Sequence, residues 1–599
     1  MHMIKSRLLL ILIFFPIFLY AIKIKTPSDV YSYAITLKKK VEYLRKQAGI
    51  TQPFPTVEPQ QEKFPRHVMQ KSLEILSKIN LYRISKGYGE IFIPPYPTRD
   101  ITPSDVYDSV KRLDEEVTPF IKNEDFLNSI KIKHYKDKTP NDVYRLLWSI
   151  SLAFDSLLGI HGYTPTEVYA LSQKLVNTIK FIRESQSIYK EVKKPKRVPG
   201  LHPNHALYKS YDLLNKISNV ERRLWLNSSP APQKPHRVIT PTDVYDSIQY
   251  DLTELQRIKY RLGLERYFKL KKANGNKTPS DVVQNIEYAM RLLPDFSLQR
   301  ELIQYPQKSL AKTPNDVFGV TQEIIRKLEI LKSLRGISQK AKDAPFIYGL
   351  KPIHAYQKAI EATEKSIRLK KQMGFYPSQV PSSPLREITP NEVYEMVLRL
   401  DGITTILLKK SGYKNVDEYI YKLNKKVYRD KTPSNVYNNL WKISNILDIL
   451  LAKEYTPNET FYMINMIKEK VRFINKKLNI KCESVKPPEV IQSKNPKDVF
   501  FLTLDIFNLV KKIQKRLNMG TTNILIPQEK TITPNTVYNA LRIVNAGINE
   551  ILIYLNTEEN NLAKFTKIPT NKTPTDVFIQ ALEVKNMLNN LFEDNCYAK

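Results

Sequence analysis

The chain has 599 residues, of which 42% are hydrophobic, and a formal net charge of +34 at pH 7. It is too long for a single core and too apolar for a disordered chain, so we expect several globular domains. Its two cysteines exclude a disulfide-dense scaffold, a zinc site built on cysteines and a c-type haem attachment.

Residues 1–21 have the pattern of a secretory signal peptide. Lys5 and Arg7 form a basic start, and the apolar run "LLLILIFFPIFLYA" ends at the small residue Ala21. This run is shorter than the roughly 20 apolar residues that span a bilayer, and no later segment is a candidate span. We therefore expect cleavage near Ala21 and a periplasmic or extracellular protein. Because Leu19 is bulky for a cleavage site, an N-terminal membrane anchor is the alternative.

Both cysteines, Cys482 and Cys596, lie in the last quarter of the chain. In an oxidising compartment they could form one disulfide. The sequence leaves open whether they do so or remain two free thiols.

A threonine-proline motif recurs along the rest of the chain. The heptapeptide "ITPSDVY" returns as "ITPTDVY", "ITPNEVY" and "ITPNTVY", with looser copies such as "KTPSDVY" and "KTPNDVF". Repeats of this length are typical of stacked helical units. The copies are centred on Pro27, Pro65, Pro103, Pro140, Pro165, Pro203, Pro241, Pro279, Pro314, Pro352, Pro390, Pro433, Pro457, Pro496, Pro534 and Pro574.

Each copy has the residues that start a helix. Threonine suits the N-cap, proline suits the first helical position, and an acid three residues after the cap completes a capping box and faces the positive end of the helix dipole. The following apolar residues keep the 3–4 spacing of one buried helical face. The predicted cap residues are Thr26, Asp29, Thr102, Asp105, Thr139, Asp142, Thr240, Asp243, Thr278, Asp281, Thr313, Asp316, Thr573 and Asp576.

The copies differ in a pattern that returns at every fourth copy. The third copy of each set reads "ITP", the fourth reads "KTP", and the second lacks the threonine, as in "FPRHVM" and "KPIHAY". We predict an all-α protein of about sixteen helices in four tandem four-helix modules, with a continuous α-solenoid as the alternative. The predicted boundaries after the signal peptide are 22–162, 163–311, 312–454 and 455–599. Helix directions are left open.

The second copies of modules one to three place a histidine where the acid is expected. Histidine at a helix N-terminus is unfavourable when protonated, so we expect these residues to do more than replace the cap. Each begins a polar stripe at offsets 0, 4, 7 and 11, on one helical face. The stripes are His67, Lys71, Glu74 and Lys78; His205, Lys209, Asp212 and Lys216; and His354, Lys358, Glu361 and Lys365.

Two interpretations of these stripes are open. They are a solvent face held by short-range ion pairs, or they line a groove that binds an anionic or carboxylate-bearing ligand. In the second case, replacing Lys71, Lys209 and Lys358 would abolish binding without much loss of stability. Module four keeps only the acid at offset 7, so it would not bind. One histidine and one carboxylate fall short of a zinc site, and we expect neither metal nor cofactor.

No catalytic motif is present: the chain contains no P-loop, GxGxxG, HExxH or GxSxG sequence. We therefore expect a non-enzymatic exported protein that binds or scaffolds on an anionic envelope component or a partner protein, because its positive charge favours anionic partners. A solvated lysine-rich surface of no special function explains the charge equally well. A small-ligand-binding or sensory protein is the alternative. Nucleic-acid binding is a weaker one, since no basic-aromatic run stands out.

Overall fold

The computed structural model describes residues 25–186, 188–235, 237–294, 311–376, 378–413, 427–482, 492–520, 523–557, 568–593 and 596; the predicted signal peptide lies outside these ranges. The predicted all-α fold is confirmed. The first two modules contain α1 (Pro27–Gln47), α2 (Pro65–Ser85), α3 (Pro103–Val117), α4 (Glu124–Ser129), α5 (Pro140–Leu158), α6 (Pro165–Ser185), α7 (Pro203–Arg223), α8 (Pro241–Arg261) and α9 (Pro279–Leu292). The last two contain α10 (Pro314–Leu334), α11 (Pro352–Gln372), α12 (Pro390–Lys410), α14 (Pro433–Leu451), α15 (Pro457–Lys477), α16 (Pro496–Arg516), α17 (Pro534–Tyr554) and α18 (Pro574–Asn589).

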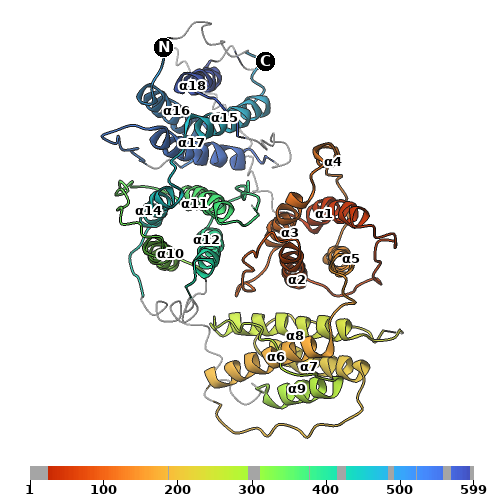
Figure 1. Cartoon of the computed structure of the whole chain (residues 1–599). Coiled ribbons are helices and arrows are strands. Elements are labelled where there is room, and N and C mark those ends of the chain that lie inside the picture. Colours follow the sequence, from red (N-terminus) through yellow and green to blue (C-terminus); the bar gives the residue numbers. More distant parts are fainter. Residues whose placement is uncertain are drawn as a thin grey trace, which may run out of the picture.

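The long helices pack in four bundles of four (Figure 1). In every bundle the first and second helices each contact the third and the fourth, so the ring order is first, third, second, fourth. An apolar core lies within each bundle. The short helix α4, in the connection between α3 and α5, is an addition that the motif spacing did not predict.

Each of the sixteen long helices begins at the motif proline, as predicted. In α1, Thr26 Oγ1 accepts the backbone N–H of Asp29 at 3.3 Å, and the Asp29 carboxylate accepts the N–H of Thr26 at 2.8 Å. The other predicted Thr–Asp pairs form the same capping box. The motif therefore satisfies N–H groups that the first turn of a helix leaves without partners.

All four helices of a bundle point in the same direction, because their N-termini are hydrogen-bonded to one another. In eleven cases among the described residues, the residue before the N-cap of a first, second or fourth helix donates its backbone N–H to the side chain that follows the motif proline of a neighbouring helix, at N···O distances of 2.7–3.2 Å. In module one the pairs are Lys25–Ser104, Lys63–Asn141 and Lys138–Ser28. We call these bonds the N-terminal links.

The N-terminal links run around the bundle from the first helix to the third, from the second to the fourth and from the fourth to the first. Helix two accepts no such bond in the described parts of the chain. In three modules the residue after its proline is Arg66, Ile353 or Lys497, which has no side-chain acceptor, and in module two Asn204 accepts the N–H of its neighbour His205 instead. Because the helices of a bundle are parallel, each connection within the bundle must run back along the full length of a helix. That length is about 30 Å for 21 residues at 1.5 Å per residue. This requirement explains the long proline-bearing connections.

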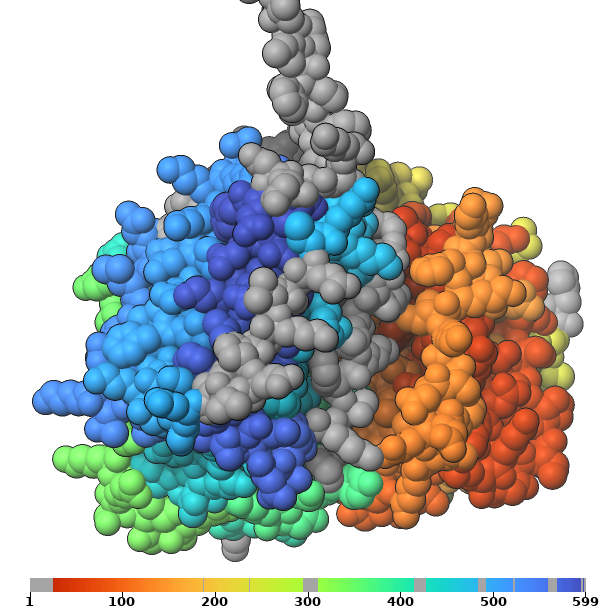
Figure 2. Space-filling model, turned by 90° about the horizontal axis from the view of Figure 1, so that it is seen from above, coloured from red at the N-terminus to blue at the C-terminus, as the bar shows by residue number. Residues whose placement is uncertain are grey.

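The bundles are arranged in the spatial order two, one, three, four (Figure 1). Helix α2 of module one contacts α8 of module two, and α11 of module three contacts α17 of module four. Since these are equivalent helices, residues 25–294 and 311–596 form two halves with the same internal docking. Seen from above, the halves appear as two adjoining masses (Figure 2).

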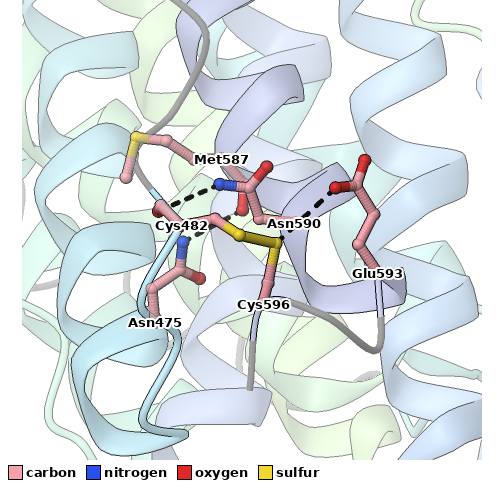
Figure 3. The surroundings of a disulfide bond; sticks show 6 residues. All are labelled: Asn475, Cys482, Met587, Asn590, Glu593 and Cys596. Carbon is pink, nitrogen blue, oxygen red and sulfur yellow. Dashed lines mark hydrogen bonds between the residues drawn. A yellow bond between two sulfur atoms is a disulfide. The ribbon is translucent and has the colours of Figure 1, made fainter. Parts of the chain in front are cut away.

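Cys482 and Cys596 form a disulfide that joins the end of α15 to the end of the chain (Figure 3). Around it, the Asn590 side chain donates to the carbonyl of Cys482 at 3.3 Å, and the Asn475 side chain donates to that of Met587 at 3.0 Å. The bridge closes a segment with a sequence separation of 114 that contains α16, α17 and α18. Of the two states left open by the sequence, the structure contains the disulfide.

Candidate functional site

The three histidines replace the acid of the capping box. Nδ1 of His67, His205 and His354 accepts the backbone N–H of the residue three positions earlier, at 3.0, 3.0 and 3.1 Å. Only a neutral ring can accept this bond, and burial lowers the pKa of His67 to about 3 and that of His354 to about 4. A neutral histidine therefore serves as this cap, and the ring of His67 also reaches Glu254 of a neighbouring module, so it does more than replace the acid.

The first stripe is buried where α2 docks on α8. His67 Nε2 lies 2.5 Å from Oε1 of Glu254, which belongs to module two. Lys71 Nζ donates to Glu74 at 2.7 Å within its own helix and to Asp246 of α8 at 2.5 Å. The stripe therefore binds another part of the same chain.

The third stripe repeats this arrangement where α11 docks on α17. Lys358 Nζ lies 2.9 Å from both carboxylate oxygens of Glu361 and 2.7 Å from Oδ1 of Asn539. Asn539 has the same position relative to its motif proline as Asp246 in the first half. The last lysine of each stripe, Lys78 or Lys365, pairs with an aspartate of the fourth helix at 2.7 Å.

Burial and close pairing set the charges of these two clusters. Burial would raise the pKa of Glu74 and Glu361, but the two lysines beside each carboxylate lower it to about 2. Burial raises the pKa of Asp246 to about 7 despite Lys71, and burial lowers that of Lys358 to about 8. Lys71 and Lys358 are thus held against carboxylates inside the protein, where an unpaired charge would be unfavourable.

The second stripe has no docked module over it. His205, Asp212 and Lys216 are exposed, and Lys209 approaches Asp212 and Glu287 at only 3.9 and 3.6 Å. The solvent-face interpretation therefore describes α7 alone. In α2 and α11 it fails, because a neighbouring module covers the same face. A ligand at those two stripes would have to displace that module.

The halves meet through the equivalent helices α3 and α12, and the contacts are reciprocal. Arg99 pairs with Glu395 at 2.7 Å, and Arg386 pairs with Asp108 at 2.6 Å. Counted from the motif proline, the two arginines are equivalent positions, and so are the two acids. The interface therefore has approximate twofold symmetry, as in a homodimer.

A cavity of about 320 Å³ lies in this interface. Its walls come from α2, α3 and residues 92–99 of the first half, from α11, α12 and residues 381–386 of the second, and from Glu265, Tyr267 and Lys312. The lining is mostly apolar and rich in proline and aromatic rings, with arginines and carboxylates at intervals. Its size falls within the range of small-molecule sites.

One arginine in the lining is incompletely paired. Arg112 donates from one guanidinium nitrogen to the backbone carbonyl of Phe92, while its buried Nε has no hydrogen-bond partner. Its equivalent, Arg399, reaches Glu115 and Glu116 at 3.4 Å each. Burial and the charge of Arg399 lower the pKa of Arg112 to about 9. Positive charge is thus only partly neutralised at this end of the cavity.

Sequence reasoning missed the cavity residues, although a signal was present. Modules one and three both carry arginine four residues before the third-copy proline, at Arg99 and Arg386, and nine residues after it, at Arg112 and Arg399. Module four carries arginine at neither position, and module two carries only the first, as Arg237. The arginine nine residues after the proline is therefore the feature that modules one and three alone share.

In the part of the chain that the structure describes, no three histidine, cysteine or acidic side chains are grouped as a metal site would require. None of the helices there is both long and apolar enough to cross a membrane. No protein-family model, curated protein or solved structure matches the chain. Its function is therefore inferred from its own geometry.

Proposed function

We propose that this is an exported, non-enzymatic binding protein whose small-molecule ligand occupies the cavity between the halves. The observation that carries the proposal is the cavity itself, formed symmetrically by equivalent helices. Among the described residues, apolar side chains fill the centres of the bundles. A second pocket of about 480 Å³ lies at the end of bundle four beside Cys482, but it is formed by one bundle and is more open to solvent. We prefer the cavity between the halves to the stripes as the ligand site, since two of the three stripes hold modules together.

The lining suits a ligand with a large apolar part. Phe92 and Tyr96 from the first half and Tyr356 and Met396 from the second all line the cavity, together with several prolines. Rigid rings and prolines lose little conformational entropy when a ligand binds. Such a wall favours a preformed apolar site.

Occupancy can be tested with the neutral fluorescent probe N-phenyl-1-naphthylamine. We expect saturable binding that Leu398→Trp, which fills the cavity, greatly weakens. The matched control is Leu81→Trp, at a position that is 52% exposed on α2 and outside the lining. Equal binding by both variants, or no saturable binding by the native protein, would contradict the proposal.

Export is supported by the signal-like residues 1–21 and by the Cys482–Cys596 disulfide, which suits an oxidising compartment. Cell fractionation followed by N-terminal sequencing tests it. We expect the mature chain in an extracytoplasmic fraction, starting near Ile22. A reduced, full-length chain in the cytosol would argue against export.

A second candidate function, docking on an anionic envelope component, is favoured by the distribution of charge. Among the described residues, the buried acidic side chains are at least as numerous as the buried basic ones, so the excess positive charge lies elsewhere, on the surface. Pull-down with envelope fractions at low and high salt tests this candidate, because salt screens exposed charges. Salt-insensitive or absent retention would oppose it. A gel-shift series against salt tests nucleic acid in the same way.

A further inference from the structure

We propose that the cavity between the halves selects amphipathic monoanions, such as a fatty carboxylate, with the acid group held by Arg112 and Arg399. The inference rests on the proposed function and adds the chemical class of the ligand. It is carried by three features of the described residues: an excess of cations at one end of the cavity, an unpartnered guanidinium nitrogen, and an apolar remainder.

The cation excess comes from two pairs of equivalent residues that meet in the interface. Arg112 and Arg399 line the cavity, and Arg83 and Lys370 lie behind them. The carboxylates beside these four cations are those of Glu90, Glu115 and Glu116, so the cations outnumber them. Glu115 and Glu116 belong to α3. Their equivalents in the second half are Gly402 and Ile403, so the symmetry supplies no further acid.

Backbone carbonyls take the place of the missing acids. Lys370 Nζ donates to the carbonyl of Glu90 at 2.8 Å, and Arg83 donates to that of Tyr376 at 3.0 Å. Arg83 Nε and Nη1 have no hydrogen-bond partner, and Nη1 lies 3.7 Å from Glu116. A dipole neutralises a buried cation less completely than a carboxylate does, so the group retains a positive field.

Arg112 is the cation best placed to bind the acid group of a ligand. Its Nε is buried without a partner and the residue lines the cavity. A guanidinium can bind a carboxylate through two parallel hydrogen bonds. By contrast, Arg99 and Arg386 each contact two carboxylates, so few of their N–H groups are left to bind a ligand.

The rest of the lining limits the ligand to a single negative charge with an apolar body. Asp105, Asp108, Glu392 and Glu395 also line the cavity, so a polyanion such as a nucleotide would meet carboxylates as well as arginines. The Phe92, Tyr96 and Tyr356 side chains suit a hydrocarbon or aromatic body. Charge and shape together favour the amphipathic monoanion.

The test compares two probes that differ only in the head group, dodecanoate and dodecanol, by isothermal titration calorimetry below their aggregation concentrations. The native protein is expected to bind dodecanoate about tenfold or more tightly than dodecanol, the range for hydrogen bonds to charged groups. Arg112→Gln should remove this preference and leave dodecanol binding unchanged. Arg291→Gln, an exposed arginine on α9, is the matched control and should behave as the native protein.

The outcomes separate this inference from the proposed function. If dodecanol and dodecanoate bind equally, or if Arg112→Gln keeps the preference, the anion site is wrong while the cavity remains a ligand site. If neither probe binds, both proposals fail. Arg112→Lys keeps the charge and should keep most of the preference; a folded Arg112→Lys that binds dodecanol but has lost the preference would also overturn the inference. Retained dodecanol binding shows that each variant is folded.

Discussion

At the residue scale, the five positions from threonine to valine in the recurring motif each have a structural role. Threonine and the acid exchange hydrogen bonds in the capping box, proline starts the helix, and valine packs in the core. The residue between proline and the acid accepts the N-terminal link from a neighbouring helix, as Ser104 does from Lys25. The motif therefore specifies both where a helix begins and which helices stand beside it.

Histidine at the cap makes the unfolding free energy depend on pH. The pKa of His354 is lowered to about 4 by burial, against about 6.5 in an unfolded chain. Between these values the unfolded state binds more protons, so stability is lost as the pH falls from about 6.5 towards 4, by up to about 1.4 kcal/mol per pH unit.

Chemical denaturation of the native protein and of His354→Asn between pH 7 and pH 4 measures this effect. We expect the difference in unfolding free energy between the two proteins to shrink as the pH falls, since only the native chain has the histidine to protonate. His205→Asn, on the exposed equivalent, controls for the change of cap. A constant difference across the range would mean that His354 has the same pKa in the folded and unfolded states, so that burial does not lower it.

At the element scale, the N-terminal links hold the helices of each bundle parallel. Each acceptor is a short side chain one residue after a motif proline. Each donor is the backbone N–H of the residue that precedes the N-cap of a neighbouring helix. Parallel packing is unusual among four-helix bundles with short loops, which run up and down. Here the links and the long connections together produce it.

Removing one acceptor should weaken a bundle without changing its core. Asn141→Ala leaves the partly buried N–H of Lys63 without its 2.7 Å bond, and we expect a loss of about 1–2 kcal/mol in unfolding free energy. The matched control is Asn204→Ala, at the same helical position of α7, where the side chain accepts the N–H of its neighbour His205 rather than a link from another helix of the described chain. Denaturant titration of both variants tests the link, and equal losses would show that it adds nothing beyond local capping.

The buried stripes make a sharper prediction at the same scale. Lys358→Met leaves the buried Glu361 with one lysine fewer, and we expect a loss of about 3–5 kcal/mol, the range for breaking a buried ion pair. Lys209→Met, at the same offset in module two, removes a side chain that is 39% exposed and should cost less than about 1 kcal/mol. Thermal and urea unfolding of both variants compares them. If both variants lose similarly little unfolding free energy, the third stripe would again be a candidate ligand site.

At the scale of the whole molecule, the chain is a duplication of a pair of bundles. Within each half, the second helix of one bundle docks on the third helix of the next through a buried charged cluster. Between the halves, α3 and α12 meet with approximate twofold symmetry and enclose the cavity. The ligand proposals therefore depend on how the halves dock.

A glycine in α12 tests this docking. A Cβ on Gly402 would overlap the ring of Phe92 from the other half, whereas a Cβ on Gly319 of α10 would make ordinary contact with Tyr428 at 3.5 Å. Alanine favours a helix by about 1 kcal/mol over glycine, so Gly319→Ala should stabilise the protein slightly. Gly402→Ala should instead lower its melting temperature and raise the radius of gyration in solution scattering.

Removing the obstructing ring should reverse that effect. We expect the double variant Gly402→Ala with Phe92→Ala to regain the native radius of gyration, because the two changes act on one contact. A Gly402→Ala protein as compact and stable as Gly319→Ala would mean that the halves do not dock through this contact in solution.

The sequence by itself determined the start, number and grouping of the helices. These follow from local chemistry, since the capping residues and the 3–4 apolar spacing act within one helix. Only the tertiary structure decided the helix directions, the burial of two stripes and the exposure of the third. Three helices carry nearly the same stripe, yet α2 and α11 are covered by α8 and α17 while α7 is not. The arginines of the cavity likewise come from segments almost three hundred residues apart, and nothing in a single segment records which distant surface will dock against it.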